Sequence, residues 1–150
     1  MSSLIKAVLP VSPSKPHDRI RVIVLSSHPY LFVYGTLKSG FRNRFARRLR
    51  REARLLGRAY MPGRLYRIRW YPGMRLPRGP EDLVTGELYK LHQPSKTLEV
   101  LDAYEGPHHY RRELHRATLE TGQAYRAWVY MYRQPRPEHC HVVSGDWPAS

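Results

Sequence analysis

Residues 31–40 have the sequence LFVYGTLKSG, a short apolar run that breaks into a segment with two glycines. The β-branched and aromatic residues among Leu31–Tyr34 are typical of a strand buried on both faces. Gly35 and Gly40 bracket a place where the backbone turns tightly or approaches another group closely. Alternatively, Gly35 only lets a strand bend, because glycine after a strand is first of all a mark of its end. The stretch therefore predicts a buried strand that ends in a turn, and it leaves open whether that turn is functional.

The length and composition favour one globular domain. A chain of 150 residues can bury about 70% of its extended-chain surface, which is enough for a core without disulfides. The 41% hydrophobic content, 13 prolines and 10 glycines predict many short elements in a mixed or strand-rich architecture. The single cysteine, Cys140, excludes an internal disulfide framework and fits a reducing compartment, so we expect the cytoplasm.

The N-terminal part differs from the rest of the chain. Residues 1–28 carry prolines, serines and lysines that predict a poorly ordered extension, followed by a domain over residues 29–150. Residues 20–25 are apolar and could add an edge strand. No apolar run reaches the about 20 residues that a membrane-spanning helix needs, and Pro10 interrupts the only candidate for a secretory signal. We therefore expect no membrane partner.

The formal charge of +14 is concentrated in one segment. Eight arginines lie between Arg42 and Arg58 against the lone Glu52, so this segment carries half of the net charge. Such a patch must face solvent or an anion. Nucleic-acid binders usually interleave basic side chains with stacking aromatics, whereas here only Phe41 and Phe45 lie nearby, at the spacing of a helical core face. The pattern therefore argues against a nucleic-acid partner and favours a solvated face.

Periodicity predicts the remaining elements. Apolar residues at four-residue steps indicate a helix over about 43–51, and a capping serine or threonine followed by Gly106-Pro107 indicates a second helix from Ser95 or Thr97 to Glu105. The other predicted elements are a strand from Ala53 that continues past Gly63 to Arg69, a turn at 71–73, a loop over 74–83, and strands at 83–91, 110–119 and 125–132, the last two joined as a hairpin by a turn at 120–123.

The sequence gives little support for a metal site or for a nucleophilic serine or cysteine. His108, His109, His139 and His141 lack any CxxC, HxxxH or carboxylate partner at ligand spacing, so we expect no metal site and no cofactor. Cys140 lies in a proline-flanked tail, and no serine has the glycine context of a nucleophile elbow.

Glu105 is an acid within an apolar, aromatic stretch at the end of the second predicted helix. The negative end of the helix dipole and partial burial would both raise the pKa of this carboxyl toward working pH, which suits a general base and acid. Alternatively, Glu105 forms an ion pair with Arg111, Arg112 or Arg116. The sequence leaves these two interpretations with equal weight.

A family resemblance extends over about residues 30–147. The chain resembles the γ-glutamylcyclotransferase-like family, and in pattern most of all its γ-glutamylamine cyclotransferase type. The order and spacing of several short motifs carry this resemblance: FVYGTL at 32–37 with Gly40 and Asn43, YPG at 71–73, VTGELY at 84–89, LDAYEG at 101–106 with YRR at 110–112, WVY at 128–130, and SGDW at 144–147.

The resemblance implies an α+β fold, a small mixed β-barrel with a few short helices. It implies that Glu105 is the essential catalytic glutamate. It also implies that the backbone amides of Tyr34, Gly35, Thr36 and Leu37 hold the glutamyl portion of a substrate, which agrees with an anion-binding nest at a strand-to-turn junction. By the same resemblance, Tyr110 belongs to the substrate-binding residues.

The implied reaction needs no protein nucleophile, metal or cofactor. The α-amine of a small γ-glutamyl substrate, an amine or an amino acid derivative, attacks its own γ-carbonyl, forms 5-oxoproline and expels the amine, with Glu105 as base and acid. A non-catalytic binder of the same fold and, behind it, a basic nucleic-acid-associated protein are the alternatives. The leaving amine and the oligomeric state stay open. If the leading interpretation holds, the amides of 35–37 and the Glu105 carboxylate face one cavity.

Overall fold

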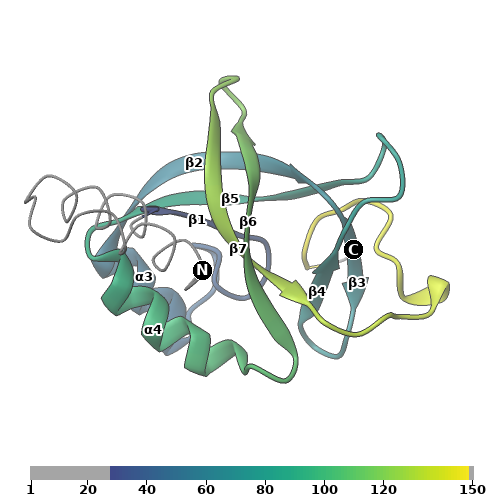
Figure 1. Ribbon diagram of the computed structural model, residues 1–150, viewed down its shortest axis with the longest axis horizontal. Helices are drawn as coiled ribbons and strands as arrows, with labels where there is room; N and C mark the ends of the chain where they lie inside the picture. The colour runs from purple at the N-terminus through teal and green to yellow at the C-terminus, as the bar shows by residue number, and fades with distance from the viewer. Residues whose placement is uncertain (1–27, 149–150) are drawn as a thin grey trace, which may run out of the picture.

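The computed structural model describes residues 28–148 (Figure 1). The predicted extension over 1–28 and the predicted edge strand at 20–25 therefore fall almost wholly outside the described residues. The elements in chain order are β1 (Tyr30–Val33), α3 (Arg44–Glu52), β2 (Ala53–Pro62), β3 (Arg64–Arg67), β4 (Pro72–Arg75), β5 (Leu83–Leu91), α4 (Pro94–Glu105), β6 (Tyr110–Leu119), β7 (Ala124–Tyr132) and the 3-10 turn η1 (Glu138–Cys140).

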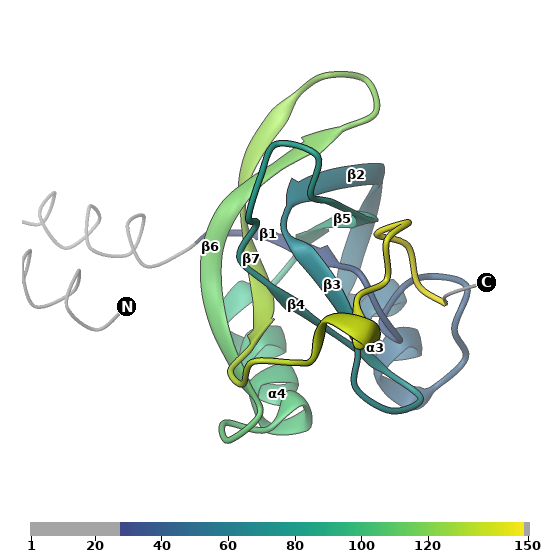
Figure 2. The same cartoon turned by 90° about the vertical axis from the view of Figure 1, so that its right-hand side faces the viewer.

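Five strands close a barrel in the order β1-β5-β2-β6-β7. The closing contact is parallel and joins β7 back to β1 at Leu31 and Trp128, whereas the other pairs around the ring are antiparallel. β4 extends the sheet beyond β7 by a second parallel pairing, between Met74 and Met131, and β3 follows it. Figure 2 shows β3 and β4 side by side in front of the barrel. The architecture confirms the predicted α+β fold with a small mixed barrel.

The core has two parts that meet at β1. Phe32 packs inside the barrel with side chains such as Leu88 and Val129. Leu31 and Val33 point the other way, into a second cluster that the helices cover with their buried leucines. Successive residues of a strand alternate between its faces, so a strand buried on both sides must be apolar at every position. The predicted doubly buried strand at 31–34 is confirmed as the strand between these two clusters.

The two helices start by different means. Asn43 caps α3, because its Oδ1 accepts the N–H of Ala46 at 2.8 Å. α4 starts at Pro94, earlier than predicted, and neither Ser95 nor Thr97 caps it. The Thr97 hydroxyl instead donates to the Glu52 carboxylate at 2.7 Å and so links the two helices. Proline suits a first helical position, because no hydrogen bond is lost there.

The region 64–83 differs from the prediction. β3 ends at Arg67, the bend lies at 69–71, and Pro72 and Gly73, predicted as part of a turn, begin β4. Proline can open a strand, where its missing N–H is not needed. Gly73 fits because a Cβ there would lie 2.7 Å from Tyr132 of the neighbouring β7. The predicted loop over 74–83 therefore starts too early, since Met74 and Arg75 belong to β4.

The β6–β7 hairpin has the predicted glycine turn. The N–H of Leu119 donates to the Gln123 carbonyl at 2.8 Å, and Gly122 takes a φ of 102°, which favours glycine. The tip of this hairpin lies at the end of the molecule away from the C-terminal end of α4 (Figure 1).

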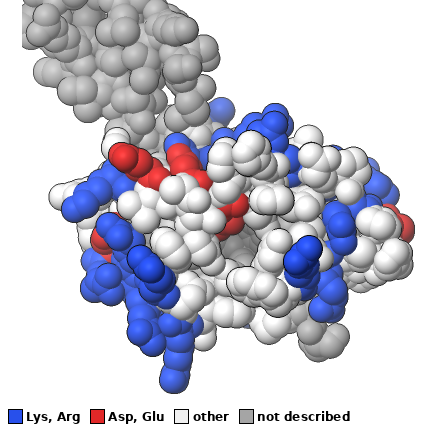
Figure 3. Space-filling model, turned by 90° about the horizontal axis from the view of Figure 1, so that it is seen from below, with Lys and Arg blue, Asp and Glu red and all other residues white. Residues whose placement is uncertain are grey.

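The arginine-rich segment lies on the outside of the molecule. Arg44, Arg47 and Arg51 are exposed on α3, while Arg48 pairs with Glu52 at 3.0 Å. Basic side chains gather at several places on the face shown in Figure 3. Within residues 28–148, no helix is both long and apolar enough to cross a membrane.

Candidate active site

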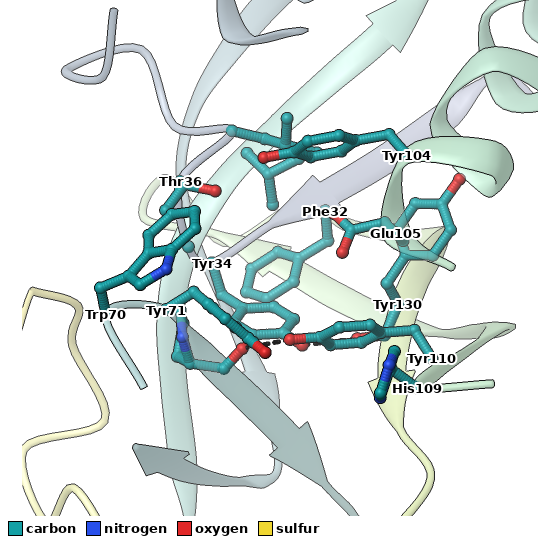
Figure 4. Close-up of a pocket in the computed structure, with 14 residues that line it drawn as sticks. Phe32, Tyr34, Thr36, Trp70, Tyr71, Tyr104, Glu105, His109, Tyr110 and Tyr130 are labelled. Carbon is teal, nitrogen blue, oxygen red and sulfur yellow. Dashed lines mark hydrogen bonds between the residues drawn. The ribbon is translucent and has the colours of Figure 1, made fainter. Parts of the chain in front are cut away.

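A cavity of about 260 Å³ opens between three segments: the turn after β1, the β3–β4 turn and the C-terminal end of α4 (Figure 4). All six residues that the sequence singled out contribute to its lining: Tyr34, Gly35, Thr36, Leu37, Glu105 and Tyr110. The rest of the lining consists of Phe32, Val33, Trp70, Tyr71, Pro72, Tyr104, His109 and Tyr130. The turn and the glutamate, about 70 residues apart in the chain, thus face one cavity.

The turn after β1 is fixed by hydrogen bonds from outside it. The Glu87 carboxylate accepts the N–H and the hydroxyl of Ser39 at 2.6 and 2.7 Å. Asn43 donates through Nδ2 to the Thr36 carbonyl at 2.7 Å. In the described part of the chain, the N–H groups of Gly35, Thr36 and Leu37 donate to no acceptor. Three successive free amides beside a cavity are able to donate to an anion or a carbonyl oxygen.

Gly35 and Gly40 serve different purposes. A Cβ on Gly35 would lie 3.0 and 3.1 Å from the ring of Pro72, so glycine lets the β1 turn approach β4 closely. A Cβ on Gly40 would meet no atom within 4 Å. Neither glycine has a φ that excludes other residues. The close approach that the sequence predicted is therefore real at Gly35 and absent at Gly40.

Glu105 is the last residue of α4, and its side chain points into the cavity (Figure 4). Burial raises the pKa of its carboxyl from 4.5 to about 7, because the cavity solvates the charged form poorly. Among residues 28–148, no group forms a hydrogen bond or salt bridge with this carboxylate. A carboxyl with a pKa near neutrality and no bound partner can both accept and return a proton.

The predicted alternative, an ion pair between Glu105 and a nearby arginine, is wrong. Arg111 binds Glu113 at 2.8 Å. Arg112 binds both oxygens of Asp102, at 2.8 and 3.1 Å. Asp102, one helical turn before Glu105, is thus the acid of α4 that binds Arg112.

Three buried tyrosines hold the cavity wall together. The hydroxyl of Tyr34 donates to the Tyr130 carbonyl at 2.5 Å and accepts the N–H of Met74 at 3.0 Å. Tyr110 donates to the Pro72 carbonyl at 2.7 Å, and the Tyr130 hydroxyl donates to Asp102 at 2.8 Å. Burial raises the pKa of all three phenols, so they remain protonated. Their protons are engaged in these hydrogen bonds, whereas the Glu105 carboxyl has no hydrogen-bond partner among residues 28–148.

From the sequence, no site role was assigned to several aromatic lining residues, among them Trp70 and Tyr104, and His109 was considered only as a metal ligand. Tyr104 precedes Glu105 directly, and its ring stacks on Phe45 of α3 at 3.9 Å between centroids. Tyr71 and Tyr104 lie within the quoted motifs YPG and LDAYEG, and Trp70 directly precedes the first of these. This was the available signal, because periodicity does not distinguish a cavity wall from a core.

His139 and His141, the histidines of the C-terminal tail, do not line the cavity. His141 follows η1, and its Nδ1 is 3.1 Å from Nη2 of Arg64. Over residues 28–148, no group of three or more His, Cys, Asp or Glu side chains has the arrangement of a metal site.

Comparisons with known proteins agree on one family. The family described as "Gamma-glutamyl cyclotransferase, AIG2-like" matches residues 31–149. A curated relative, "Gamma-L-glutamyl-butirosin B gamma-glutamyl cyclotransferase" of Niallia circulans, is 34% identical over 125 residues, which cover 79% of this chain and 75% of that protein.

Solved structures show the same fold. An aig2-like protein from Mus musculus is 27% identical with a TM-score of 0.60, covering 74% of this chain and 81% of that one. YkqA from Bacillus subtilis has a TM-score of 0.63 at 22% identity, covering 81% of this chain but only 40% of YkqA, so this chain spans less than half of that protein. The family match over most of the chain, together with the relative from Niallia circulans, leads to one conclusion: the chain belongs to the gamma-glutamyl cyclotransferase, AIG2-like family and is a γ-glutamylcyclotransferase-like enzyme.

Proposed function

We propose that this protein converts the γ-glutamyl group of a small γ-glutamyl amine or amino acid to 5-oxoproline and releases the amine, with Glu105 as general base and then general acid. One observation carries the proposal: a carboxyl with a pKa of about 7 and three free backbone amides line the same cavity.

The turn after β1 binds the glutamyl end. The N–H groups of Gly35, Thr36 and Leu37 donate to oxygens of the glutamyl portion. No lysine or arginine lines the cavity to compete with these amides for the same oxygens. Held in this way, the substrate curls so that its α-amino nitrogen meets its own γ-carbonyl carbon. Orientation of this kind can supply several kcal/mol toward the barrier.

The chemistry then requires one proton to change places. Glu105 takes a proton from the α-amino nitrogen as that nitrogen bonds to the γ-carbonyl carbon. The tetrahedral centre collapses, the original C–N amide bond breaks, and Glu105 returns the proton to the leaving nitrogen. The reaction is balanced without an added water, nucleophile or cofactor, because the nucleophile is part of the substrate.

The test is a screen of γ-glutamyl amines, γ-glutamyl dipeptides and glutathione for release of 5-oxoproline. Glu105→Gln keeps the shape of the side chain but cannot accept the proton, so kcat should fall by about 10²–10⁴-fold. Glu99→Gln is the matched control: the same change, on an exposed side chain of the same helix. Undiminished turnover in Glu105→Gln would remove the mechanism, and binding without 5-oxoproline release from any compound would indicate a non-catalytic binder.

A further inference from the structure

Trp70 is unusual among the cavity residues because it is both part of the lining and 71% exposed. A large aromatic ring held in water gains nothing from burial, so an exposed tryptophan at a cavity is a candidate contact for a ligand. Among the other lining aromatics, His109 is also exposed, whereas Phe32 and the tyrosines are buried or half-buried. Trp70 therefore lies at the mouth of the cavity, on the side away from Glu105 (Figure 4).

Backbone hydrogen bonds and a ring contact hold the turn that carries Trp70. The N–H groups of Ile68 and Arg69 both donate to the Tyr71 carbonyl, at 3.1 and 3.2 Å. The indole ring also packs edge-on against the ring of Tyr71, with centroids 5.0 Å apart and planes at 80°. Such an indole needs little further ordering when a ligand stacks on it.

Pro72, which directly follows the turn at 69–71, connects this turn to the part of the cavity proposed to be catalytic. Tyr110 donates to the carbonyl of Pro72, and the ring of Pro72 lies against Gly35 of the β1 turn. Figure 4 shows Trp70 and Tyr71 on the opposite side of the cavity from Glu105. A substrate held by the amides of the β1 turn must extend its amine substituent toward the mouth, and Trp70 forms one wall of that exit.

The charges around the cavity disfavour an anionic substituent. The 14 lining residues include no lysine or arginine, although the chain has 26 of them. Two nearby arginines are engaged, Arg112 with Asp102 and Arg75 with the Tyr132 carbonyl. The face in Figure 3 has basic groups on both sides of its central hollow and acidic atoms at the upper rim of that hollow. A carboxylate on the substituent would therefore find no lysine or arginine among the lining residues to pair with.

We infer that Trp70 determines specificity for the leaving amine, and that the preferred substrates carry an aromatic ring on that amine, which stacks on the indole. The inference rests on the proposed function, since it concerns the amine that the cyclisation expels. The ring binds outside the reacting centre, so it affects substrate capture rather than the proton transfers at Glu105.

The experiment compares two substrates that differ only in the ring, γ-glutamyl-ethylamide and γ-glutamyl-2-phenylethylamide, by release of 5-oxoproline. The phenylethylamide should have a roughly tenfold higher kcat/KM, mainly through a lower KM, because uniform binding leaves kcat unchanged. In Trp70→Ala the ratio between the two substrates should fall toward one, and Trp70→Phe should restore most of it. Leu76→Ala, which removes another exposed apolar side chain outside the lining, should keep the wild-type ratio.

The outcomes separate this inference from the proposed function. If neither amide releases 5-oxoproline, and the wider screen also fails, the proposed function is wrong and the inference falls with it. If both amides are cyclised with equal kcat/KM, the proposed function stands and the inference is overturned. It is also overturned if Trp70→Ala keeps the preference for the phenylethylamide, because the ring then binds elsewhere.

Discussion

Asn43 links helix α3 to the turn after β1: its Nδ2 donates to the Thr36 carbonyl at 2.7 Å while its Oδ1 accepts the N–H of Ala46 at 2.8 Å. One side-chain amide thus begins α3 and fixes the carbonyl beside the free amides. The two bonds can be separated, because only the first requires a donor.

Asn43→Asp should keep the helix cap and lose the bond to Thr36. An aspartate accepts the Ala46 N–H and suits a helix N-terminus, so the free energy of unfolding should change by less than about 1 kcal/mol. Its carboxylate faces the Thr36 carbonyl, however, and should loosen the turn and raise KM. Asn43→Ala loses both bonds and should cost about 1 kcal/mol in addition. Urea denaturation and steady-state kinetics measure the two effects. An unchanged KM in Asn43→Asp would show that the turn holds its shape without this bond.

Alanine at the two glycines of the β1 turn should give opposite results. In Gly35→Ala the new methyl group meets the Pro72 ring at 3.0 Å, so the turn and β4 must separate. We expect a loss of about 1–3 kcal/mol in unfolding free energy and a lower kcat/KM. Gly40→Ala meets no atom within 4 Å and should be neutral or stabilising by up to about 1 kcal/mol. Thermal melts of the pair, with kinetics on each, check the prediction. Equal stability of the two variants would contradict the tight packing at Gly35.

The raised pKa of Glu105 can be tested without any substrate. The folded pKa of about 7 lies above the ordinary 4.5, so the fold favours the protonated carboxyl. The stability that this preference contributes is present below about pH 4.5 and is lost as the pH rises through 7. Glu105→Gln carries no charge at any pH. The variant should match the wild type at pH 4 and be more stable at pH 8, by on the order of 2–3 kcal/mol.

Denaturation of both proteins across this pH range measures the difference. Glu99→Gln should run parallel to the wild type, because the Glu99 side chain is exposed. A stability difference between Glu105→Gln and the wild type that does not vary with pH would mean that the carboxyl is solvated normally. The same titration predicts that kcat/KM of the wild type falls as the pH drops below about 7, since the base must be ionised to accept a proton.

Tyr34→Phe should act on stability more than on chemistry. Removing the hydroxyl leaves two buried backbone groups without a partner, the Tyr130 carbonyl and the Met74 N–H. The expected cost is about 1–3 kcal/mol in urea denaturation. The fall in kcat should be much smaller than in Glu105→Gln, because the phenol proton is engaged away from the reacting centre. A hundredfold loss of kcat without a loss of stability would instead mean that the Tyr34 phenol takes part in the reaction.

Local patterns predicted most of the barrel correctly. The apolar run before Gly35, the alternation in β5 and the glycine turn between β6 and β7 depend on neighbours in the chain, so their signals are local. β4 was missed for the opposite reason. Pro72-Gly73 is an ordinary turn signal, and its strand character comes from pairing with β7, where Met74 meets Met131. Such a long-range parallel contact leaves no period in the sequence.

The candidate site likewise combines features that have a local sequence signal with features that only the fold determines. Glu105 could be singled out because an acid in an aromatic stretch is rare, and the turn at 35–37 because glycine marks it. Which arginine binds which acid could not be predicted, since Asp102 and Glu105 are both near Arg112 in sequence and only the fold assigns Arg112 to Asp102. The exposure of Trp70 at the cavity mouth is likewise a property of the assembled walls.

The turn of the β6–β7 hairpin is a suitable insertion site for immobilising this enzyme. Tyr110 lines the cavity at one end of β6, and the strand runs ten residues to the turn, which at the usual rise is roughly 30 Å. A fluorescent protein or affinity tag inserted between Thr121 and Gly122 would therefore project from the far end of the barrel. The enzyme could be fixed to a surface through that insertion with its cavity mouth open to solution.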